Sequence, residues 1–332
     1  MKQEEKKKLS TEPYKGVRDF YPEDMAVQNH IYSVWRKVAE KFGYQEYAAS
    51  LLEPAELYRS KGSDEIVNEQ MFTFKDRGDR EVALRPEMTP SLARMVAARR
   101  KSLKFPLRWY TIANCFRYER PQRGRRREHW QLNADVMGLP AATSTAQAGI
   151  AGVEAEVEII SLAHAIMKEF GAKDEDFEIR VNDRKVVSEV FEPLLRDKTQ
   201  WGEVCRFLDK RPKLSQEEQD AGNKKYFIRP FDKEDAKKIH ESRMLSELQK
   251  VLAKKDIKIE LDSAIMRGFD YYTGMVFEVF DTHTDNRRSL FGGGRYDNLL
   301  ELFGADPVPT VGFGMGDITI RDFLETHRLP LA

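Results

Sequence analysis

The sequence holds a dense run of arginines in the stretch CFRYERPQRGRRREHWQLNADVMG, which spans residues 115–138. Six of the eleven residues from 117 to 127 are arginines, and Glu119 lies among them. The arginine guanidinium suits phosphate because it donates two parallel hydrogen bonds and keeps its charge. A solvated charged loop is the commonest origin of such a run. Arg117 and Asp135, however, fall at expected core positions of extended segments, where an unpaired charge is costly.

The bulk composition fits a globular chain and limits the class of partner. The chain has 332 residues, 41% of them apolar, and its 55 lysines and arginines balance 55 aspartates and glutamates. Zero net charge argues against a protein that coats nucleic acid, while a local basic site stays compatible with it. Two cysteines cannot form a disulfide framework or a cysteine-based zinc site. The start MKQEEKKKLS leads into no apolar run, and no stretch of about 18 apolar residues exists, so we expect a cytoplasmic protein without a signal peptide or membrane span.

Extended segments must position the arginine run. Residues 105–119 and 131–137 have the pattern of strands, and the polar loop between them contains a proline and a glycine, which predicts a long antiparallel hairpin. Residues 84–98 have the pattern of a strand, a turn and a helix, with Thr89 as the helix N-cap. Other helices are expected at 24–42 and 150–170, and other strands at 177–182, 257–262 and 275–281.

The order of these elements predicts the fold class. Strands joined by hairpins, with helices between groups of strands, indicate an α+β fold built on an antiparallel sheet. The lack of a regular βαβ alternation argues against a dinucleotide-binding fold. Residues 190–255 are dense in lysine, glutamate and aspartate and contain a helical pattern at 233–254, which indicates a helical insertion.

Six segments carry a resemblance to a known family. The arginine stretch resembles the second signature motif of class II aminoacyl-tRNA synthetases, in the form found in histidyl-tRNA synthetases. Five further segments resemble that family in the same order: YKGVRDFYPEDM at 14–25, LRPEMTPSLAR at 84–94, RGFDYYTGMVFE at 267–278, GGGRYDNL at 292–299 and VPTVGFGMGD at 308–317. RGFDYYTG is the most diagnostic of them. The resemblance implies a class II antiparallel sheet flanked by helices.

The resemblance also implies a division of the chain. We expect an N-terminal tail at 1–13, a catalytic core at 14–189 and 256–328, and a helical insertion at 190–255. Family members usually continue with an anticodon-binding domain of about 100 residues. This chain ends at Ala332, so we expect the C-terminal anticodon-binding domain to be absent. Class II catalytic modules pair through their first motif, which predicts a homodimer.

The implied activity is that of a ligase. It joins histidine to AMP from ATP and then passes the histidyl group to the 3′ end of tRNA(His). A carboxylate attacks the α-phosphate in the first step, so catalysis is mainly positioning and electrostatic stabilisation. Arg117 and Arg267 match the family arginines beside the α-phosphate and are the expected catalytic residues, whereas Glu119 matches an adenine-binding residue and Arg125 one that reaches the outer phosphates. Mg²⁺ is expected to bridge the ATP phosphates, and no metal site formed by the protein alone is expected.

Recognition of histidine needs an acceptor for the α-ammonium group and partners for two ring nitrogens. Tyrosine suits such a ligand because it offers an aromatic wall and a hydroxyl. By resemblance, the histidine-binding residues are Glu87, Met88, Thr89, Arg117, Gln131, Asp135, Arg267, Tyr271 and Tyr272. By the same resemblance, the ATP-binding residues are Arg117, Glu119, Arg125, His129, Arg267 and Gly314.

Three positions depart from the family pattern. Most class II enzymes have an arginine that packs against ATP where this chain has Thr319, and Arg321, two residues further along a helix, faces elsewhere. Asp135 is one methylene shorter than the glutamate common at its position. His129 stands where an adenine-stacking aromatic residue is common. Thr319 therefore removes one expected contact to ATP.

Two other functions fit parts of the pattern. One is a histidine-binding regulatory paralogue of ATP phosphoribosyltransferase, which lacks the anticodon-binding domain and has about this length. Retention of Arg117, Glu119, Arg125 and Arg267 favours the ligase, because a regulator has no use for all of these groups. The other is an amide ligase of the synthetase-like type, which the RGFDYYTG segment disfavours. Histidine-dependent exchange of pyrophosphate into ATP separates these functions.

Overall fold

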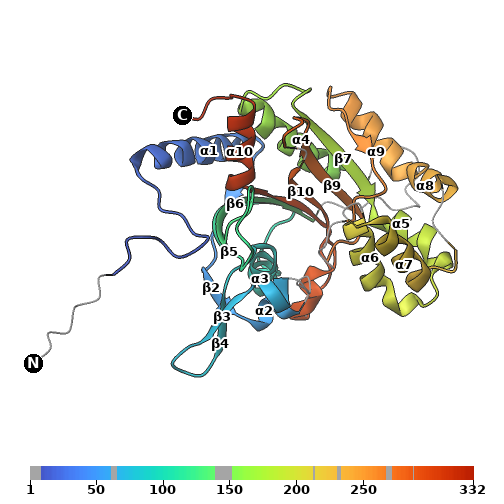
Figure 1. The fold of residues 1–332 in the computed structure, drawn as a ribbon, viewed down its shortest axis with the longest axis horizontal. Coiled ribbons are helices and arrows are strands. Elements are labelled where there is room, and N and C mark those ends of the chain that lie inside the picture. The colour runs from blue at the N-terminus through green and yellow to red at the C-terminus, as the bar shows by residue number, and fades with distance from the viewer. Residues whose placement is uncertain are drawn as a thin grey trace, which may run out of the picture.

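A long sheet carries most of the segments that the sequence singles out (Figure 1). The computed structural model describes residues 9–60, 66–138, 152–211, 214–229, 233–266, 271–286 and 288–332. Eight strands form the main sheet in the order β1-β5-β6-β11-β10-β9-β7-β8. These strands are β1 (Gln45–Glu46), β5 (Leu107–Phe116), β6 (Glu128–Met137), β7 (Phe177–Asp183), β8 (Glu260–Leu261), β9 (Met275–Asp281), β10 (Ser289–Arg295) and β11 (Thr310–Gly316). The six inner strands pair antiparallel and the two short edge strands pair parallel, so the predicted α+β fold is confirmed.

The arginine run joins two ten-residue strands of this sheet. β5 and β6 pair antiparallel over their whole length, from Leu107 opposite Met137 to Phe116 opposite Glu128. The predicted hairpin is therefore confirmed. Residues 117–127, called the arginine loop from here on, connect the two strands at one end of the sheet.

Three helices cover one face of the main sheet: α1 (Pro22–Lys41), α4 (Glu154–Glu169) and α10 (Asp317–Thr326), as Figure 1 shows. α1 buries apolar side chains three and four residues apart, as the sequence predicts. Alternate residues of β6 and β11 complete this core, because successive side chains of a strand point to opposite faces. The remaining side chains of these strands face away from the three helices. None of the helices that the structure describes is long and apolar enough to span a membrane.

A smaller sheet and a helix flank the arginine loop. The small sheet has the order β2-β4-β3, with β2 (Leu52–Pro54), β3 (Phe72–Lys75) and β4 (Glu81–Leu84). Residues 85–88 lead from β4 into α3 (Thr89–Arg99). The prediction that Thr89 is the N-cap is wrong by one residue, since Met88 is the N-cap and Thr89 is already helical. Proline at one of the first two positions still starts the helix as expected.

A group of helices lies at one end of the main sheet (Figure 1). It comprises α5 (Arg184–Phe191), α6 (Trp201–Lys210), α7 (Gln216–Tyr226), α8 (Lys233–His240) and α9 (Arg243–Ala253). The helices α5 and α6 contribute to an apolar cluster separate from the main core, whereas α9 packs on the main core. The prediction of a single helix at 233–254 is wrong, because α8 ends at His240 and a new helix, α9, begins after Ser242. The side chain of Ser242 accepts a hydrogen bond from the Leu245 amide and caps α9.

Candidate active site

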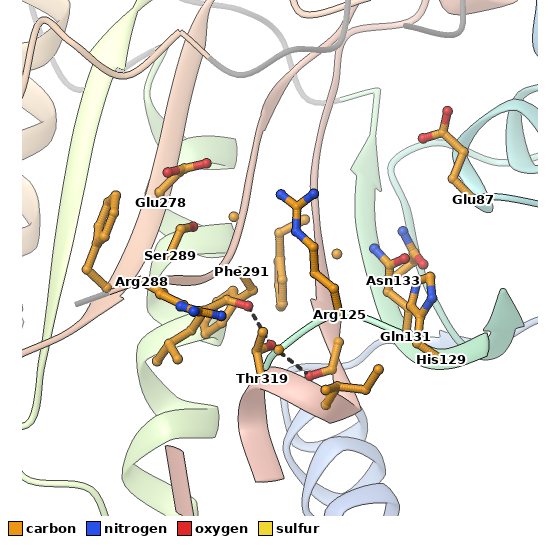
Figure 2. Close-up of a pocket in the computed structure, with 18 of the residues that line it drawn as sticks. Glu87, Arg125, His129, Gln131, Asn133, Glu278, Arg288, Ser289, Phe291 and Thr319 are labelled. Atoms are coloured by element: carbon orange, nitrogen blue, oxygen red, sulfur yellow. Dashed lines mark hydrogen bonds between the residues drawn. The ribbon is translucent and has the colours of Figure 1, made fainter. Parts of the chain in front are cut away.

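The face of the main sheet that the helices leave uncovered borders a cavity of about 880 Å³. Figure 2 shows part of its lining, with labelled side chains from β6, β9, β10, the arginine loop, the segment before α3 and the start of α10. Most residues predicted from the sequence line this one cavity: Glu87, Thr89, Arg117, Glu119, Arg125, His129, Gln131, Asp135, Tyr271, Tyr272 and Gly314. The folded chain therefore brings together residues that are far apart in the sequence.

Two predicted residues are not among these lining groups. The side chain of Met88 is buried in an apolar cluster with Ala113 and Cys115 and does not line the cavity. Arg267 lies outside the described residues, so its role stays a prediction.

A row of polar side chains on β6 faces a row of glycines on β11. Gln131, Asn133 and Asp135 are two residues apart, so they share the cavity face of the sheet. In the pairing of the two strands, Gly312 lies opposite Asp135 and Gly314 opposite Asn133. A Cβ atom on Gly312 would lie 2.0 Å from Asp135 Oδ1, and one on Gly314 would lie 1.7 Å from Gln131 Nε2. The glycines thus leave room for the polar side chains to lean across β11.

Asp135 is a buried carboxyl group on the cavity wall, with 2% of its surface exposed. Its Oδ1 accepts a hydrogen bond from the hydroxyl of Tyr296. Burial raises the pKa of Asp135 to about 7, although the hydrogen bond from Tyr296 acts in the opposite direction. At neutral pH the group is therefore divided between its two protonation states, and a ligand that donates a hydrogen bond to it favours the ionised one.

Tyr296, the partner of this carboxyl group, belongs to a cluster of three tyrosines. The ring centroid of Tyr271 lies 4.9 Å from that of Tyr272 and 5.5 Å from that of Tyr296. The hydroxyl of Tyr271 donates to Glu87 Oε2 at 3.1 Å, and both residues are buried. Aromatic faces beside two carboxyl groups suit a flat heterocycle with polar edges and a neighbouring ammonium group.

The arginine loop brings positive charge to the same cavity. Arg117 donates from Nε to the carbonyl oxygen of Pro86 at 2.9 Å, which fixes its position at the end of β5. Arg125 Nη1 lies 3.3 Å from Glu119 Oε2, at an ion-pair distance without hydrogen-bond geometry. Burial and, to a smaller extent, the charge of Arg117 lower the pKa of His129 to about 3, so the imidazole is neutral at physiological pH. The positive charge here belongs to guanidinium groups, which suit phosphate.

Other arginines of the loop hold its structure. Arg123 donates to the carboxylate of Asp322 at 2.9 Å and to the hydroxyl of Thr326 at 3.2 Å. Arg127 is buried and donates to the hydroxyl of Tyr14 at 2.8 Å. Arg123 therefore fixes the loop to α10, and Arg127 fixes it to the N-terminal segment. The sequence pattern alone does not distinguish these structural arginines from those that face the cavity.

The first turn of α10 closes another side of the cavity. Asp317 is completely buried and accepts hydrogen bonds from Arg18 at 2.6 Å, from Gln28 at 3.1 Å and from the Trp130 amide at 2.9 Å. These bonds tie the N-terminal segment and α1 to β6. Thr319, the departure from the family pattern, lines the cavity.

Several residues that line the cavity were not predicted from the sequence. Asn133 is 5% exposed, and its Oδ1 has no hydrogen-bond partner in the part of the chain that the structure describes. Its position between Gln131 and Asp135 on one strand face would have predicted it. Tyr296 belongs to the GGGRYDNL segment but meets Asp135 only in the fold. Arg288 precedes that segment, and no sequence signal indicates it.

The cavity thus combines acidic and aromatic groups with guanidinium groups. This combination fits a cationic or heteroaromatic amino acid next to a polyphosphate, because each ligand meets groups of complementary charge. Within the described ranges, no cluster of three or more histidine, cysteine, aspartate or glutamate side chains could hold a metal ion.

Comparison with known proteins decides the family. The family model described as histidyl-tRNA synthetase matches residues 16–317. The chain belongs to the histidyl-tRNA synthetase family. Among its relatives in this family, a histidine–tRNA ligase of Leptospira biflexa is 42% identical over 345 aligned positions, which cover 97% of this chain and 76% of the relative. The chloroplastic/mitochondrial histidine–tRNA ligase of Arabidopsis thaliana is 37% identical, over 97% of this chain and 68% of the relative.

Solved structures share the synthetase fold. A histidyl-tRNA synthetase from Nostoc has a TM-score of 0.73 and 22% identity, over 98% of this chain and 78% of that one. A Bacillus halodurans protein described as an ATP phosphoribosyltransferase regulatory subunit/histidyl-tRNA synthetase has a TM-score of 0.72 and 24% identity, over 96% of this chain and 84% of that one. At this identity the two likenesses establish the fold alone. The relatives at 37% and 42% identity favour the ligase over the regulator.

Proposed function

We propose that this chain activates histidine with ATP and transfers the histidyl group to the 3′ end of tRNA(His), as the catalytic domain of a histidine–tRNA ligase. The observation that carries the proposal is one cavity in which two carboxyl groups and three tyrosines adjoin the guanidinium groups of the arginine loop. Membership of a family whose curated relatives are histidine–tRNA ligases supports the same activity.

In this proposal histidine occupies the acidic and aromatic part of the cavity. Its α-ammonium group donates to Glu87, which the hydroxyl of Tyr271 already orients. Its ring contacts the tyrosines and places one N–H toward Asp135. The buried Oε1 of Gln131 has no hydrogen-bond partner among the described residues and accepts from the same ligand. Because buried polar groups need partners, amino acids without matching donors bind poorly.

ATP places its α-phosphate beside Arg117. The carboxylate oxygen of histidine attacks the α-phosphorus, a new C–O–P linkage forms, and the bond to the bridging oxygen breaks so that pyrophosphate leaves with its electron pair. The hydrogen bond from Arg117 Nε to the carbonyl of Pro86 leaves the two terminal nitrogens as donors for the reacting groups. Arg267 is proposed as the second catalytic arginine, and Glu119 and the neutral His129 as adenine contacts.

Mg²⁺ enters this proposal as a companion of ATP. When bound, it supplies charge neutralisation to the phosphates, and it prefers oxygen ligands. Asp262 and Glu278 place carboxylates on the cavity wall, so the donor set fits such an ion (Figure 2 labels Glu278).

The proposal also covers contacts with the acceptor end of the tRNA and association of two copies of the chain. Arg120 and Arg126 are exposed on the arginine loop, where they suit the phosphates of the tRNA acceptor end. The exposed apolar side chains of Leu52 and Phe74 on the small sheet, and of Leu51 just before it, suit burial against a second copy of the chain. We therefore propose a homodimer that acts in the cytoplasm, and light scattering of the purified protein tests the dimer.

Histidine-dependent exchange of pyrophosphate into ATP tests the proposed activity. We expect exchange with histidine and none above background with lysine, glutamine or asparagine, which lack an imidazole ring. Folded protein that shows no exchange with histidine contradicts the proposal. Titration of ATP phosphoribosyltransferase with this chain then examines the regulatory alternative.

A further inference from the structure

The turn between β9 and β10 brings a guanidinium group to the cavity beside the first turn of α10. Arg288 directly precedes β10 and lines the cavity together with Thr319, and Figure 2 shows both. A Cβ atom placed on Gly124 would lie 3.5 Å from Arg288 Nη1 and 3.7 Å from Thr319 Cγ2. Arg288, Thr319 and the tip of the arginine loop therefore border one small region.

Neither Thr319 nor Arg321 brings a positively charged side chain to this region from α10. The hydroxyl of Thr319 donates to the backbone carbonyl of Leu290 at 2.7 Å, so it is directed to the main chain. Arg321, one half-turn further on, pairs with Asp24 at 3.2 Å and with Glu325 at 2.9 Å, and it does not line the cavity.

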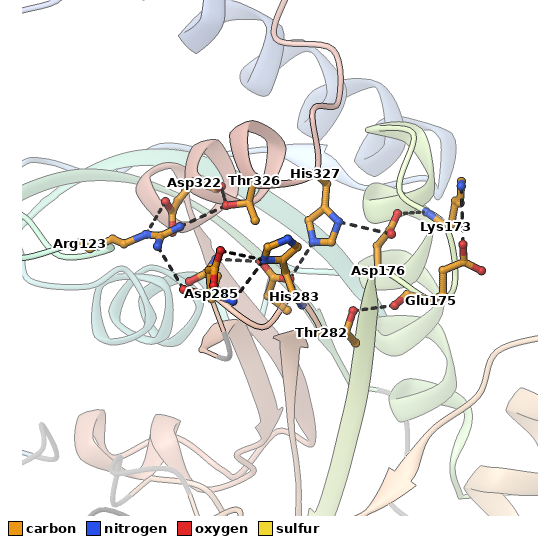
Figure 3. Close-up of polar contacts among 12 residues, drawn as sticks. Arg123, Lys173, Glu175, Asp176, Thr282, His283, Asp285, Asp322, Thr326 and His327 are labelled. Carbon is orange, nitrogen blue, oxygen red and sulfur yellow. Dashed lines mark hydrogen bonds and ion pairs between the residues drawn. The ribbon is translucent and has the colours of Figure 1, made fainter.

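Arg123 borders the same region, but its charge is paired with a carboxylate and each of its guanidinium nitrogens has a partner. Figure 3 shows it between Asp322, Thr326 and Asp285. Nε lies 2.9 Å from Asp322 Oδ1, Nη2 lies 3.2 Å from Thr326 Oγ1, and Nη1 lies 3.2 Å from the backbone oxygen of Asp285. All three nitrogens have partners, and one partner neutralises the charge. A phosphate would therefore compete with the carboxylate of Asp322 for the charge of Arg123.

The charge of Arg288 has no such counter-ion. Its Nη1 donates to the backbone carbonyl of Arg123, and no carboxylate pairs with it among the residues that the structure describes. A guanidinium has five N–H donors, so most of them remain for a ligand after this one bond. The bond to Arg123 also keeps the long side chain directed toward the arginine loop.

We infer that Arg288 binds the outermost phosphate of ATP and supplies, from the β9–β10 turn, the positive charge that Thr319 does not. The inference rests on the proposed function, because it requires a triphosphate that extends from Arg117 past Arg125 toward α10. An arginine at position 319 would reach the same small region from the helix, which explains how a chain with Thr319 retains a cation there.

Nucleotide binding measured without turnover tests this role. Isothermal titration compares AMP with the β,γ-imido analogue of ATP, both with Mg²⁺. Arg288→Ala should weaken binding of the triphosphate analogue about 10- to 100-fold, the loss expected for charge-assisted hydrogen bonds, and change AMP binding by less than about twofold. Arg288→Lys should give a smaller loss, because it keeps the charge without the planar fork.

A second variant and a matched control sharpen the test. Adding Thr319→Arg to Arg288→Ala should recover about tenfold of the lost affinity, because the helix then supplies the guanidinium. Arg321→Ala removes an arginine of α10 that lies away from the cavity, and both nucleotides should bind to it as to the unaltered protein.

Two results would overturn the inference. If Arg288→Ala binds the triphosphate analogue with unchanged affinity, Arg288 does not contact the phosphate. Equal losses for AMP and the analogue indicate that Arg288 acts only through the carbonyl of Arg123, by positioning the arginine loop. If the alanine variant fails to fold, Arg288→Lys and Arg288→Gln provide the same comparison. Absence of histidine-dependent exchange in the unaltered protein contradicts the proposed ligase activity but leaves these binding measurements valid.

Discussion

Replacement of Asp135 by asparagine tests the proposed histidine pocket most directly, because this carboxyl group is buried and has a shifted pKa. Burial raises the pKa of Asp135 to about 7 in the free protein. The hydroxyl of Tyr296 occupies Oδ1, and no described residue bonds to Oδ2. A ring N–H of histidine needs an ionised acceptor there. Asparagine keeps the size and the acceptor for Tyr296 but cannot titrate.

The number of protons released when histidine binds follows from the pKa of Asp135. At pH 7 about half of the Asp135 carboxyls carry a proton, so binding of histidine to the ionised form should release about 0.5 proton per site, rising to about 0.9 at pH 6 and falling to about 0.1 at pH 8. The pKa is raised, so the protonated form dominates below pH 7 and the binding-competent form above it. Affinity should therefore increase about tenfold from pH 6 to pH 8 through this group alone.

Calorimetry in two buffers of different ionisation enthalpy measures the protons released. Free histidine titrates in this range, and so does Asp183, whose pKa burial raises to about 6, but both start from the same protonation state in the two proteins. The difference between the unaltered protein and Asp135→Asn thus reports the titration of Asp135 together with its effect on the bound imidazole. We expect the variant to lose the extra proton release and to bind histidine about tenfold more weakly at pH 8. Identical proton counts for the two proteins at pH 6 and pH 7 would refute the reasoning.

Three other changes test separate parts of the site. Gly314→Ala should raise the KM for histidine at least about tenfold with little change in Tm, because the new Cβ would lie 1.7 Å from Gln131 Nε2 and must displace that amide; an unchanged KM would contradict this. Tyr271→Phe removes the 3.1 Å hydrogen bond to Glu87 and should weaken histidine binding about tenfold while sparing ATP, as titration of both ligands would show; the reverse ranking counts against the pocket. Arg267→Ala should reduce pyrophosphate exchange at least about 100-fold without unfolding the protein, and near-normal exchange would reject its catalytic role.

Local sequence patterns predicted much of this fold. The β5–β6 hairpin followed from two extended segments and a polar loop, and α1 from apolar residues at helical spacing. These predictions succeeded because hydrogen bonds of helices and hairpins join residues close in sequence. The helix expected at 233–254 failed because Ser242 starts a new helix there. That break depends on a single capping hydrogen bond, which residue periodicity does not reveal.

The chain order and residue types by themselves determined the family, the presence of guanidinium and carboxyl groups, and the strand face shared by Gln131 and Asp135. Only the tertiary structure decided which arginines hold the loop and which face the cavity. It also paired Asp135 with Tyr296, 161 residues away, and placed Arg288 beside Thr319. The physical reason is that charge state and ligand access depend on burial and on partners brought together by long-range packing, whereas residue spacing encodes only the local conformation.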